Sequence, residues 1–312
     1  MVAGERAGVD ARLAEARLAE AGLVDARLVA PVLAWYPGAA RDLPWRASDR
    51  TPWGVLVSEV MLQQTPVARV EPVWRAWLDR WPTPAALAEA PTADVLRAWG
   101  TLGYPRRALR LAACARAVVE HHGGALPTTE AELRALPGIG AYTAAAVVAF
   151  AHGRRAVVLD TNVRRVLART LGGQGLPPAH LTRGEQSRAD AVWPADDARA
   201  AAWSQAVMEL GALVCTARAP RCAACPVASS CAWRAAGSPP PTTAPRTQAW
   251  TGTDRQARGR IMAVLRDAVG PVGEGALTAA WPHDAEQRAR ALAGLLADGL
   301  VARAGDGYGL PE

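Results

Sequence analysis

The sequence has 312 residues, a hydrophobic content of 50% with 21% charged residues, and a formal net charge of +6 at pH 7. The length allows two or three domains, and the composition is typical of a folded protein and excludes a disordered chain. No run of 18 or more uncharged apolar residues is present, which excludes a membrane-spanning helix. The positive charge favours a polyanionic partner. Since the first residues lack a signal-peptide pattern, we expect a cytoplasmic protein.

The expected elements are nearly all helices. Residues 1–30 repeat an alanine–leucine–charge pattern that predicts a helical extension. Over residues 51–153, apolar residues recur every three or four positions between short Gly/Pro breaks, which predicts a helical domain. The segment RAVVLD at 155–160 predicts a strand, and TNVRRVLAR after it predicts a helix. Residues 237–252 have the composition of a linker, and residues 253–312 predict three helices and a hairpin, as in a small winged-helix-like module.

Four cysteines lie close together near residue 220. Cys215, Cys222, Cys225 and Cys231 form the pattern C-x6-C-x2-C-x5-C, whereas Cys114 stands alone in an apolar helix. In a reducing compartment such an array indicates a metal centre. Structural zinc usually pairs two C-x2-C knuckles, and only one is present. The uneven spacing favours a 4Fe–4S cluster, with zinc as the alternative.

The stretch LPGIGAYT, at residues 136–143, interrupts two helical segments. Gly138 and Gly140 permit a tight hairpin there and a close backbone approach to a ligand. The unpaired N–H groups that begin the second helix favour a phosphate. A simple turn between helices is the alternative, which the basic charge and the cysteine array make less favourable.

Several motifs of the sequence together resemble those of a known family. LPGIG, then Asp160 in VVLDTNVRRVLAR, then the cysteine array resemble the helix–hairpin–helix DNA glycosylases of the endonuclease III superfamily. LPWR at 43–46, SEVMLQQT at 58–65, LGY at 102–104 and MELGALVC at 208–215 are similar to its adenine glycosylases of the MutY type. The resemblance extends from Pro31 to Arg234. It implies an all-α fold: a six-helix barrel domain (51–153), an iron–sulfur domain (31–50 and 154–236), a linker (237–252) and the small module (253–312).

Tyr142 stands where bifunctional members of this superfamily carry a catalytic lysine. All 35 basic residues of the chain are arginines, so no lysine can form a Schiff base. The resemblance therefore implies a monofunctional enzyme that removes a base without cleaving the strand. The Tyr142 hydroxyl is expected to orient a carboxylate or the attacking water.

Two carboxylates are expected to carry the chemistry. Adenine leaves a deoxyribose readily only when its ring is protonated, and a carboxylic acid with a raised pKa in a partly dry pocket can supply that proton. The position of Glu59 within SEVMLQQT assigns it this role. Asp160 is expected to stabilise the oxocarbenium-like sugar, as in retaining glycosidases, and the dipole of the following helix should keep it ionised. Its alternative is a plain helix N-cap. Asn162 resembles the residue that orients this carboxylate.

The remaining candidate residues are assigned by the resemblance to DNA contacts. The adenine must leave the duplex to reach such a pocket. The residues expected to line that pocket or to read the opposite base are Trp45, Arg46, Gln63, Gln64, Thr65, Leu102 and Tyr104, with Tyr104 as the stacking wedge.

The sequence is therefore interpreted as a monomeric DNA glycosylase of base excision repair that removes adenine mispaired with guanine or 8-oxoguanine. Two alternatives stay open. One is a thymine or other pyrimidine mismatch glycosylase, which Glu59 disfavours. The other is a non-catalytic DNA-binding redox sensor built on the iron–sulfur cluster, against which both Glu59 and Asp160 argue.

Overall fold

The computed structural model describes residues 22–241 and 250–312. Most of the extension expected over residues 1–30, and residues 242–249 of the expected linker, lie outside the described residues. The chain divides into two compact units, Met1–Asp42 with Ala145–Ala244, and Leu43–Ala144 with Pro245–Glu312. Each unit joins segments that are far apart in the sequence.

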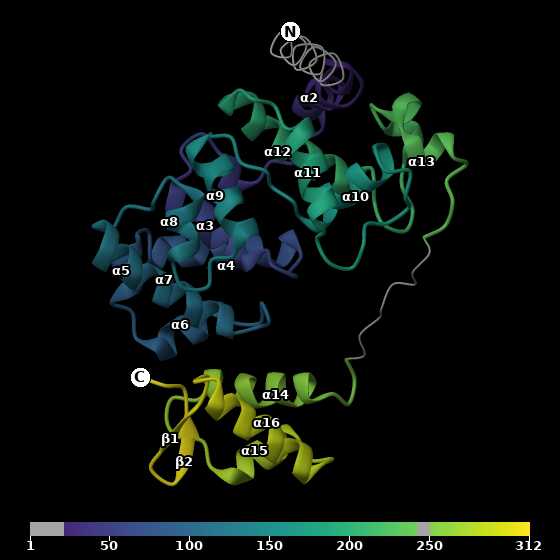
Figure 1. The fold of residues 1–312 in the computed structure, drawn as a ribbon. Helices are drawn as coiled ribbons and strands as arrows, with labels where there is room; N and C mark the ends of the chain where they lie inside the picture. Colours follow the sequence, from purple (N-terminus) through teal and green to yellow (C-terminus); the bar gives the residue numbers. More distant parts are fainter. Residues whose placement is uncertain (1–21, 242–249) are drawn as a thin grey trace, which may run out of the picture. The chain divides into compact units, whose positions relative to one another are not determined.

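The unit that begins at Leu43 contains a series of helices whose starts are encoded locally (Figure 1). The side chains of Thr51, Thr83 and Thr129 each accept a hydrogen bond from a backbone N–H of the first turn. Three tryptophans pack together in its core. The Trp77 ring meets those of Trp81 and Trp99 edge to face, with ring centroids 4.7 and 5.7 Å apart. The elements are the 3-10 turn η2 (Pro44–Arg46) and helices α3 (Pro52–Met61), α4 (Val67–Arg80), α5 (Pro84–Ala88), α6 (Thr92–Trp99), α7 (Arg106–His122), α8 (Glu130–Ala135) and the start of α9 (Ala141–His152).

In the other unit, α12 (Asp197–Leu213) packs against α10 (Thr161–Thr170) and against α2 (Ala30–Ala39). Gly211 of α12 allows α10 and α12 to approach closely, because a Cβ at this position would lie 2.7 Å from the Cβ of Asn162 on α10. Glu209 of α12 is fully buried, and its Oε1 is 2.6 Å from Nε of Arg41, just after α2. Its elements are the π-helical turn η1 (Asp25–Val29), α2 (Ala30–Ala39), the rest of α9, α10 (Thr161–Thr170), α11 (Arg183–Val192), α12 (Asp197–Leu213), η3 (Cys222–Ala224), η4 (Ala228–Ser230) and α13 (Ala232–Ala235).

The strand expected at RAVVLD is wrong. Residues 153–160 form no helix and no strand, since no neighbouring segment pairs with them, and they connect α9 to α10. The apolar alternation instead reflects burial of alternate side chains within this connection: Ala156 and Val158 have 2% and 0% of their surface exposed.

Three helices and a hairpin form the C-terminal segment, at the positions that the sequence predicts (Figure 1). Ile261, Leu265, Leu277 and Leu295 form its buried core. Strands β1 (Ala302–Ala304) and β2 (Gly307–Gly309) are antiparallel, and Val272 adds an isolated bridge to Tyr308. The elements are α14 (Asp254–Asp267), α15 (Glu274–Ala280), α16 (Ala285–Ala297), β1 (Ala302–Ala304) and β2 (Gly307–Gly309). None of the helices in the described ranges has the length and apolar character needed to cross a membrane.

Candidate active site

Glu59 lies in the last turns of α3 and is 95% buried, with 5% of its surface exposed. The Tyr142 hydroxyl, from the second residue of α9, donates a hydrogen bond to its Oε2 at 2.9 Å. A carboxyl group that is withdrawn from water and oriented by a hydroxyl suits proton transfer to a bound base. Of the two roles expected for Tyr142, the geometry therefore supports orienting a carboxylate, and that carboxylate is Glu59.

Two segments near the end of α3 carry the residues assigned to the opposite base. Thr65 is buried, and its hydroxyl donates to the Leu102 carbonyl at 3.1 Å. Gln64 is exposed and has a positive φ of 57°, and Tyr104 is 44% exposed with a φ of 49°. The structure thus joins the segments 63–65 and 102–104 and presents Gln64 and Tyr104 to solvent.

Other expected DNA contacts have a different environment. The side chain of Leu102 is buried, so in this structure it packs inside the unit. Trp45 is buried too, with its ring centroid 5.6 Å from that of Trp74. Arg46 is half-buried in the same 3-10 turn. Gln63 lies near α9, where its Nε2 is 3.4 Å from the hydroxyl oxygen of Thr143.

The hairpin between α8 and α9 has the conformation that its glycines predict. Gly138 has a φ of 77°, and a Cβ there would lie 2.8 Å from the Cβ of Arg110. Leu136 and Ile139 are buried and anchor the turn, while both glycines are exposed at its tip. The first backbone N–H groups of α9 therefore lie beside an exposed turn, as an anion site requires.

Asp160 forms the N-cap of α10. Its Oδ1 accepts from the backbone N–H of Val163, and its Oδ2 accepts from Nδ2 of Asn162, both at 2.7 Å. The orienting role expected of Asn162 agrees with this contact. Burial raises the pKa of the Asp160 carboxyl group, and the two hydrogen bonds and the charge of Arg165 only partly oppose it. Desolvation is thus the largest effect on this carboxyl group, and the direction of its pKa shift is opposite to the one expected from the sequence.

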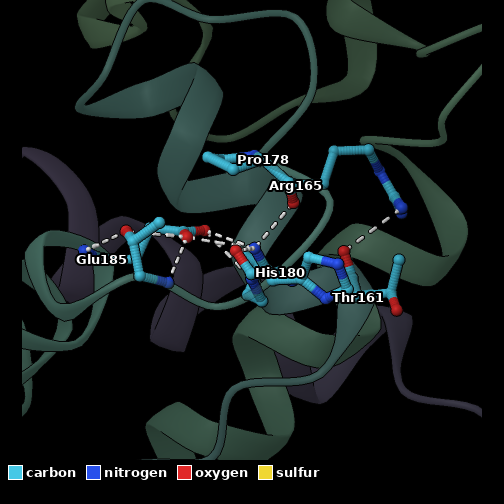
Figure 2. A network of polar contacts seen from close by, with 7 residues as sticks. Thr161, Arg165, Pro178, His180 and Glu185 are labelled. Atoms are coloured by element: carbon cyan, nitrogen blue, oxygen red, sulfur yellow. Dashed lines mark hydrogen bonds and ion pairs between the residues drawn. The ribbon is translucent and has the colours of Figure 1, made fainter. Parts of the chain in front are cut away.

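Arg165 connects the Asp160–Asn162 pair to the cysteine segment. Its Nη2 donates to Oδ1 of Asn162 at 2.8 Å and to the Gly211 carbonyl at 2.7 Å, and its Nε donates to the Cys215 carbonyl at 2.7 Å. It also approaches the Thr161 carbonyl, as Figure 2 shows. The guanidinium therefore fixes the orientation of Asn162, and through it that of Asp160.

A second arginine of α10 positions the loop that precedes α11. Arg164 donates hydrogen bonds to both carboxylate oxygens of Glu185 and to the carbonyls of Pro178 and His180, three partners that are labelled in Figure 2. Glu185 in turn completes a capping box with Thr182 at the start of α11. These contacts hold α10, which Asp160 caps, against the neighbouring loop.

The four cysteines line one small hollow, together with Arg169 and Trp233. Nη1 of Arg169 lies 3.3 Å from Sγ of Cys215, and its guanidinium stacks over the Trp233 ring at 4.7 Å. Burial raises the pKa of the Cys215 thiol, and the Arg169 charge opposes this rise. A guanidinium beside a buried sulfur favours its thiolate form, which is the form that binds metal.

Four thiols that line one hollow are the type of donor set that a 4Fe–4S cluster or a structural zinc takes. No three His, Cys, Asp or Glu side chains in residues 22–241 and 250–312 are arranged to hold a single ion. A single zinc needs its thiolates around one point, whereas a four-iron cluster takes its four thiolates at separate irons. Cys114 has a different environment, since burial raises the pKa of its thiol to about 12.

Sequence reasoning missed Arg107, Arg165 and Arg169, which are all buried. Arg165 lies three residues after Asn162, and Arg169 lies four residues after Arg165. This spacing places all three on one helix face, and this was the available signal. Arg107 gave no signal of this kind.

The fold has known relatives in DNA repair. Residues 57–187 match the model of the HhH-GPD superfamily of base excision DNA repair proteins. A thermostable thymine-DNA glycosylase has a similar structure, with a TM-score of 0.63 and 26% sequence identity over 69% of this chain and 98% of that one. An endonuclease III from a trapped covalent DNA complex has a TM-score of 0.57 at 23% identity, which shows the fold alone. These matches confirm the expected all-α, helix–hairpin–helix glycosylase class.

Closer sequence relatives specify the branch of this class. An adenine DNA glycosylase of Mycolicibacterium smegmatis is 52% identical over 281 residues, which are 89% of this chain and 94% of the relative. One of Mycobacterium tuberculosis is 53% identical over 90% of this chain and 92% of its own. The human adenine DNA glycosylase is 44% identical over 64% of this chain and 38% of its own length. The chain therefore belongs to the adenine DNA glycosylase family of the HhH-GPD superfamily.

Proposed function

We propose that the protein is a monofunctional DNA glycosylase that removes adenine mispaired with guanine or 8-oxoguanine in duplex DNA. The observation that carries the proposal is the buried Glu59 carboxyl group, which the Tyr142 hydroxyl orients at 2.9 Å. The relatives named adenine DNA glycosylases, with up to 94% of their length covered, support the same assignment.

In this mechanism Glu59 protonates the departing adenine at N7, which neutralises the charge that develops on the ring. Asp160, oriented by Asn162, stabilises the positive charge of the sugar as the base leaves. The hairpin at 137–140 binds a backbone phosphate, and Gln64 and Tyr104 contact the opposite strand. Cys215, Cys222, Cys225 and Cys231 would hold a 4Fe–4S cluster, which links the segments that carry them into one structure.

The direct test is base release from four duplexes, with adenine or thymine opposite guanine or opposite 8-oxoguanine. Release of adenine alone supports the proposal. Release of thymine opposite guanine would instead support a pyrimidine mismatch glycosylase, as the solved thymine-DNA glycosylase relative suggests. Binding without any base release would favour the non-catalytic redox sensor.

The products should be intact abasic strands. The chain contains no lysine, and Tyr142 cannot form a Schiff base with the sugar. We expect strand breaks only after alkali or heat, when products are separated on a denaturing gel. Borohydride treatment during the reaction should trap no covalent adduct. A trapped adduct would contradict a monofunctional mechanism.

Purified protein should be brown and contain about four irons per chain. Cys225→Ser should lose most of the iron, measured by metal analysis and visible absorbance. Cys114→Ala is the matched control, because this thiol is buried in α7 and should leave the iron content unchanged. Stoichiometric zinc without iron would overturn the cluster assignment.

The C-terminal module is expected to contribute phosphate contacts rather than base discrimination. Within it, Arg258 pairs with Asp298, and Arg288 donates to the Trp281 carbonyl at 3.0 Å, whereas Arg260 is exposed. Truncation at about Gly237 should weaken binding to all duplexes alike and reduce the salt dependence of the binding constant. The measurement is base release and binding on adenine opposite guanine and opposite 8-oxoguanine. A loss confined to 8-oxoguanine would make the module the reader of the damaged base.

A further inference from the structure

Arg107, in the second position of α7, is a buried cation in the unit that carries Glu59. Its Nη1 donates to the carbonyls of Val60, Met61 and Gln63 at 2.8, 3.0 and 2.7 Å. The partners of its Nη2 are the Thr65 hydroxyl at 3.0 Å and the carbonyls of Leu102 and Gly103 at 3.4 and 3.0 Å. One guanidinium thus joins the end of α3 to the segments 63–65 and 102–104.

These contacts flank two strained residues. Gln64 and Tyr104 have φ values of 57° and 49°, in the left-handed region that non-glycine residues rarely adopt. Arg107 bonds the residues on both sides of Gln64, and the two residues directly before Tyr104. Its guanidinium also lies 5.7 Å from the centroid of the Tyr104 ring. Such strained conformations persist only where the surroundings fix them, and Arg107 supplies that constraint at both positions.

The charge of Arg107 is held in place by neutral oxygens and aromatic rings. Its second aromatic neighbour, Trp99, lies at 5.1 Å and itself donates to the Gly103 carbonyl at 3.0 Å. Burial lowers the pKa of Arg107 to about 10, so the side chain stays charged at neutral pH. A lysine would keep the charge, but its single nitrogen cannot contact six oxygens spread over three segments.

We propose that Arg107 is a positioning residue that holds Gln64 and Tyr104 in the conformation that enters DNA, in register with the helix of Glu59. The inference rests on the proposed function, because it gives Gln64 and Tyr104 their role at the opposite base. Arg107 does not touch DNA in this scheme. Its loss should therefore impair extrusion of the target base more than binding of the duplex.

The experiment separates these two steps in a Glu59→Gln background, which blocks base release. The duplex carries 2-aminopurine in place of the target adenine, opposite 8-oxoguanine, so that its fluorescence rises when the base leaves the stack. We expect Arg107→Lys and Arg107→Met to reduce this rise by at least about fivefold at saturating protein. Duplex affinity, from fluorescence anisotropy, should change by less than about threefold, which corresponds to less than about 0.7 kcal/mol.

Two further variants make the result specific. Arg116→Lys changes an exposed arginine of the same helix and should behave like the parent. Thr65→Val removes the hydroxyl that accepts from Arg107 and donates to Leu102, and it should reduce the fluorescence rise to an intermediate level. Circular dichroism melting establishes which variants are folded. If the Arg107 variants do not fold, Thr65→Val alone provides the test.

A full fluorescence rise in a folded Arg107 variant, or in Thr65→Val, would overturn the inference. Equal losses of affinity and extrusion would also overturn it, since they would indicate a general structural defect. Failure of the wild-type protein to release adenine would overturn the proposed function, and the inference with it. That outcome can be distinguished from a failure of the inference alone, because base release by the wild-type protein is measured before any Arg107 variant.

Discussion

Glu59→Gln should abolish adenine release while the protein still binds the mispaired duplex. The substitution keeps the size of the side chain and an acceptor for the Tyr142 hydroxyl, which lies 2.9 Å from Oε2 in the native protein. It removes the proton that the departing adenine needs. General acid catalysis contributes about 10²–10⁴-fold to rates, so we expect a loss of at least that size in single-turnover base release.

The matched control is Glu71→Gln. Glu71 lies on the neighbouring helix α4 and forms an exposed pair with Arg75 at 2.9 Å. Its substitution removes the same carboxylate chemistry without touching the buried pair, so activity should stay within about twofold, as expected for exposed pairs worth under about 1 kcal/mol. Normal adenine release by Glu59→Gln would exclude Glu59 as the proton donor.

The helical architecture could be predicted because its signals are local. Apolar spacing marks the buried face of α3, where Leu56, Val60 and Met61 are all at most 5% exposed. Gly/Pro breaks such as WPTP fall between helices, here between α4 and α5. The strand expected at 155–160 failed because a strand needs a partner, and pairing depends on distant residues that apolar alternation does not reveal.

The candidate site could be predicted only where a motif carries it. Glu59 and Asp160 were found through short motifs, but the electrostatic environment of Asp160 was not, because desolvation depends on the packing around it. Arg107 was missed for a related reason. Its acceptors Val60 and Met61 are 47 and 46 residues away in the chain, and they are carbonyls, which any sequence provides. In a chain whose basic residues are all arginines, a buried structural arginine has no distinctive signature.

Asp160→Asn should be nearly inactive as well. The carboxylate is oriented by Nδ2 of Asn162 and the N–H of Val163, both at 2.7 Å, and only its charge can stabilise the positive sugar. Removing one preorganised electrostatic stabiliser costs about 10²–10³-fold, which sets the minimum loss expected in single-turnover base release. An active Asp160→Asn variant would reduce Asp160 to a helix cap.

The same substitution should also change the stability of the fold, by an amount that depends on pH. Burial raises the pKa of Asp160 in the folded protein, so the native state favours the protonated carboxyl group more than the unfolded chain does. The wild type therefore loses stability as pH rises from about 4, the ordinary value for an aspartate, through the raised folded pKa. Asparagine cannot ionise and does not pay this penalty. Altered hydrogen bonds in the variant would shift its Tm by the same amount at every pH. The gain in Tm from no longer burying an ionised carboxylate, in contrast, increases with pH. The Tm of Asp160→Asn minus that of the wild type should therefore increase between pH 4 and pH 8, measured by circular dichroism.

Asp196→Asn is the control. Asp196 caps α12, with its Oδ1 2.8 Å from the backbone nitrogen of Arg199, but it is exposed, so no such increase is expected. A difference in Tm that stays flat or decreases with pH would show that Asp160 is not held against its own ionisation. An increase accompanied by lost activity would show instead that the fold gives up stability at neutral pH to keep a charged carboxylate where the sugar cation forms.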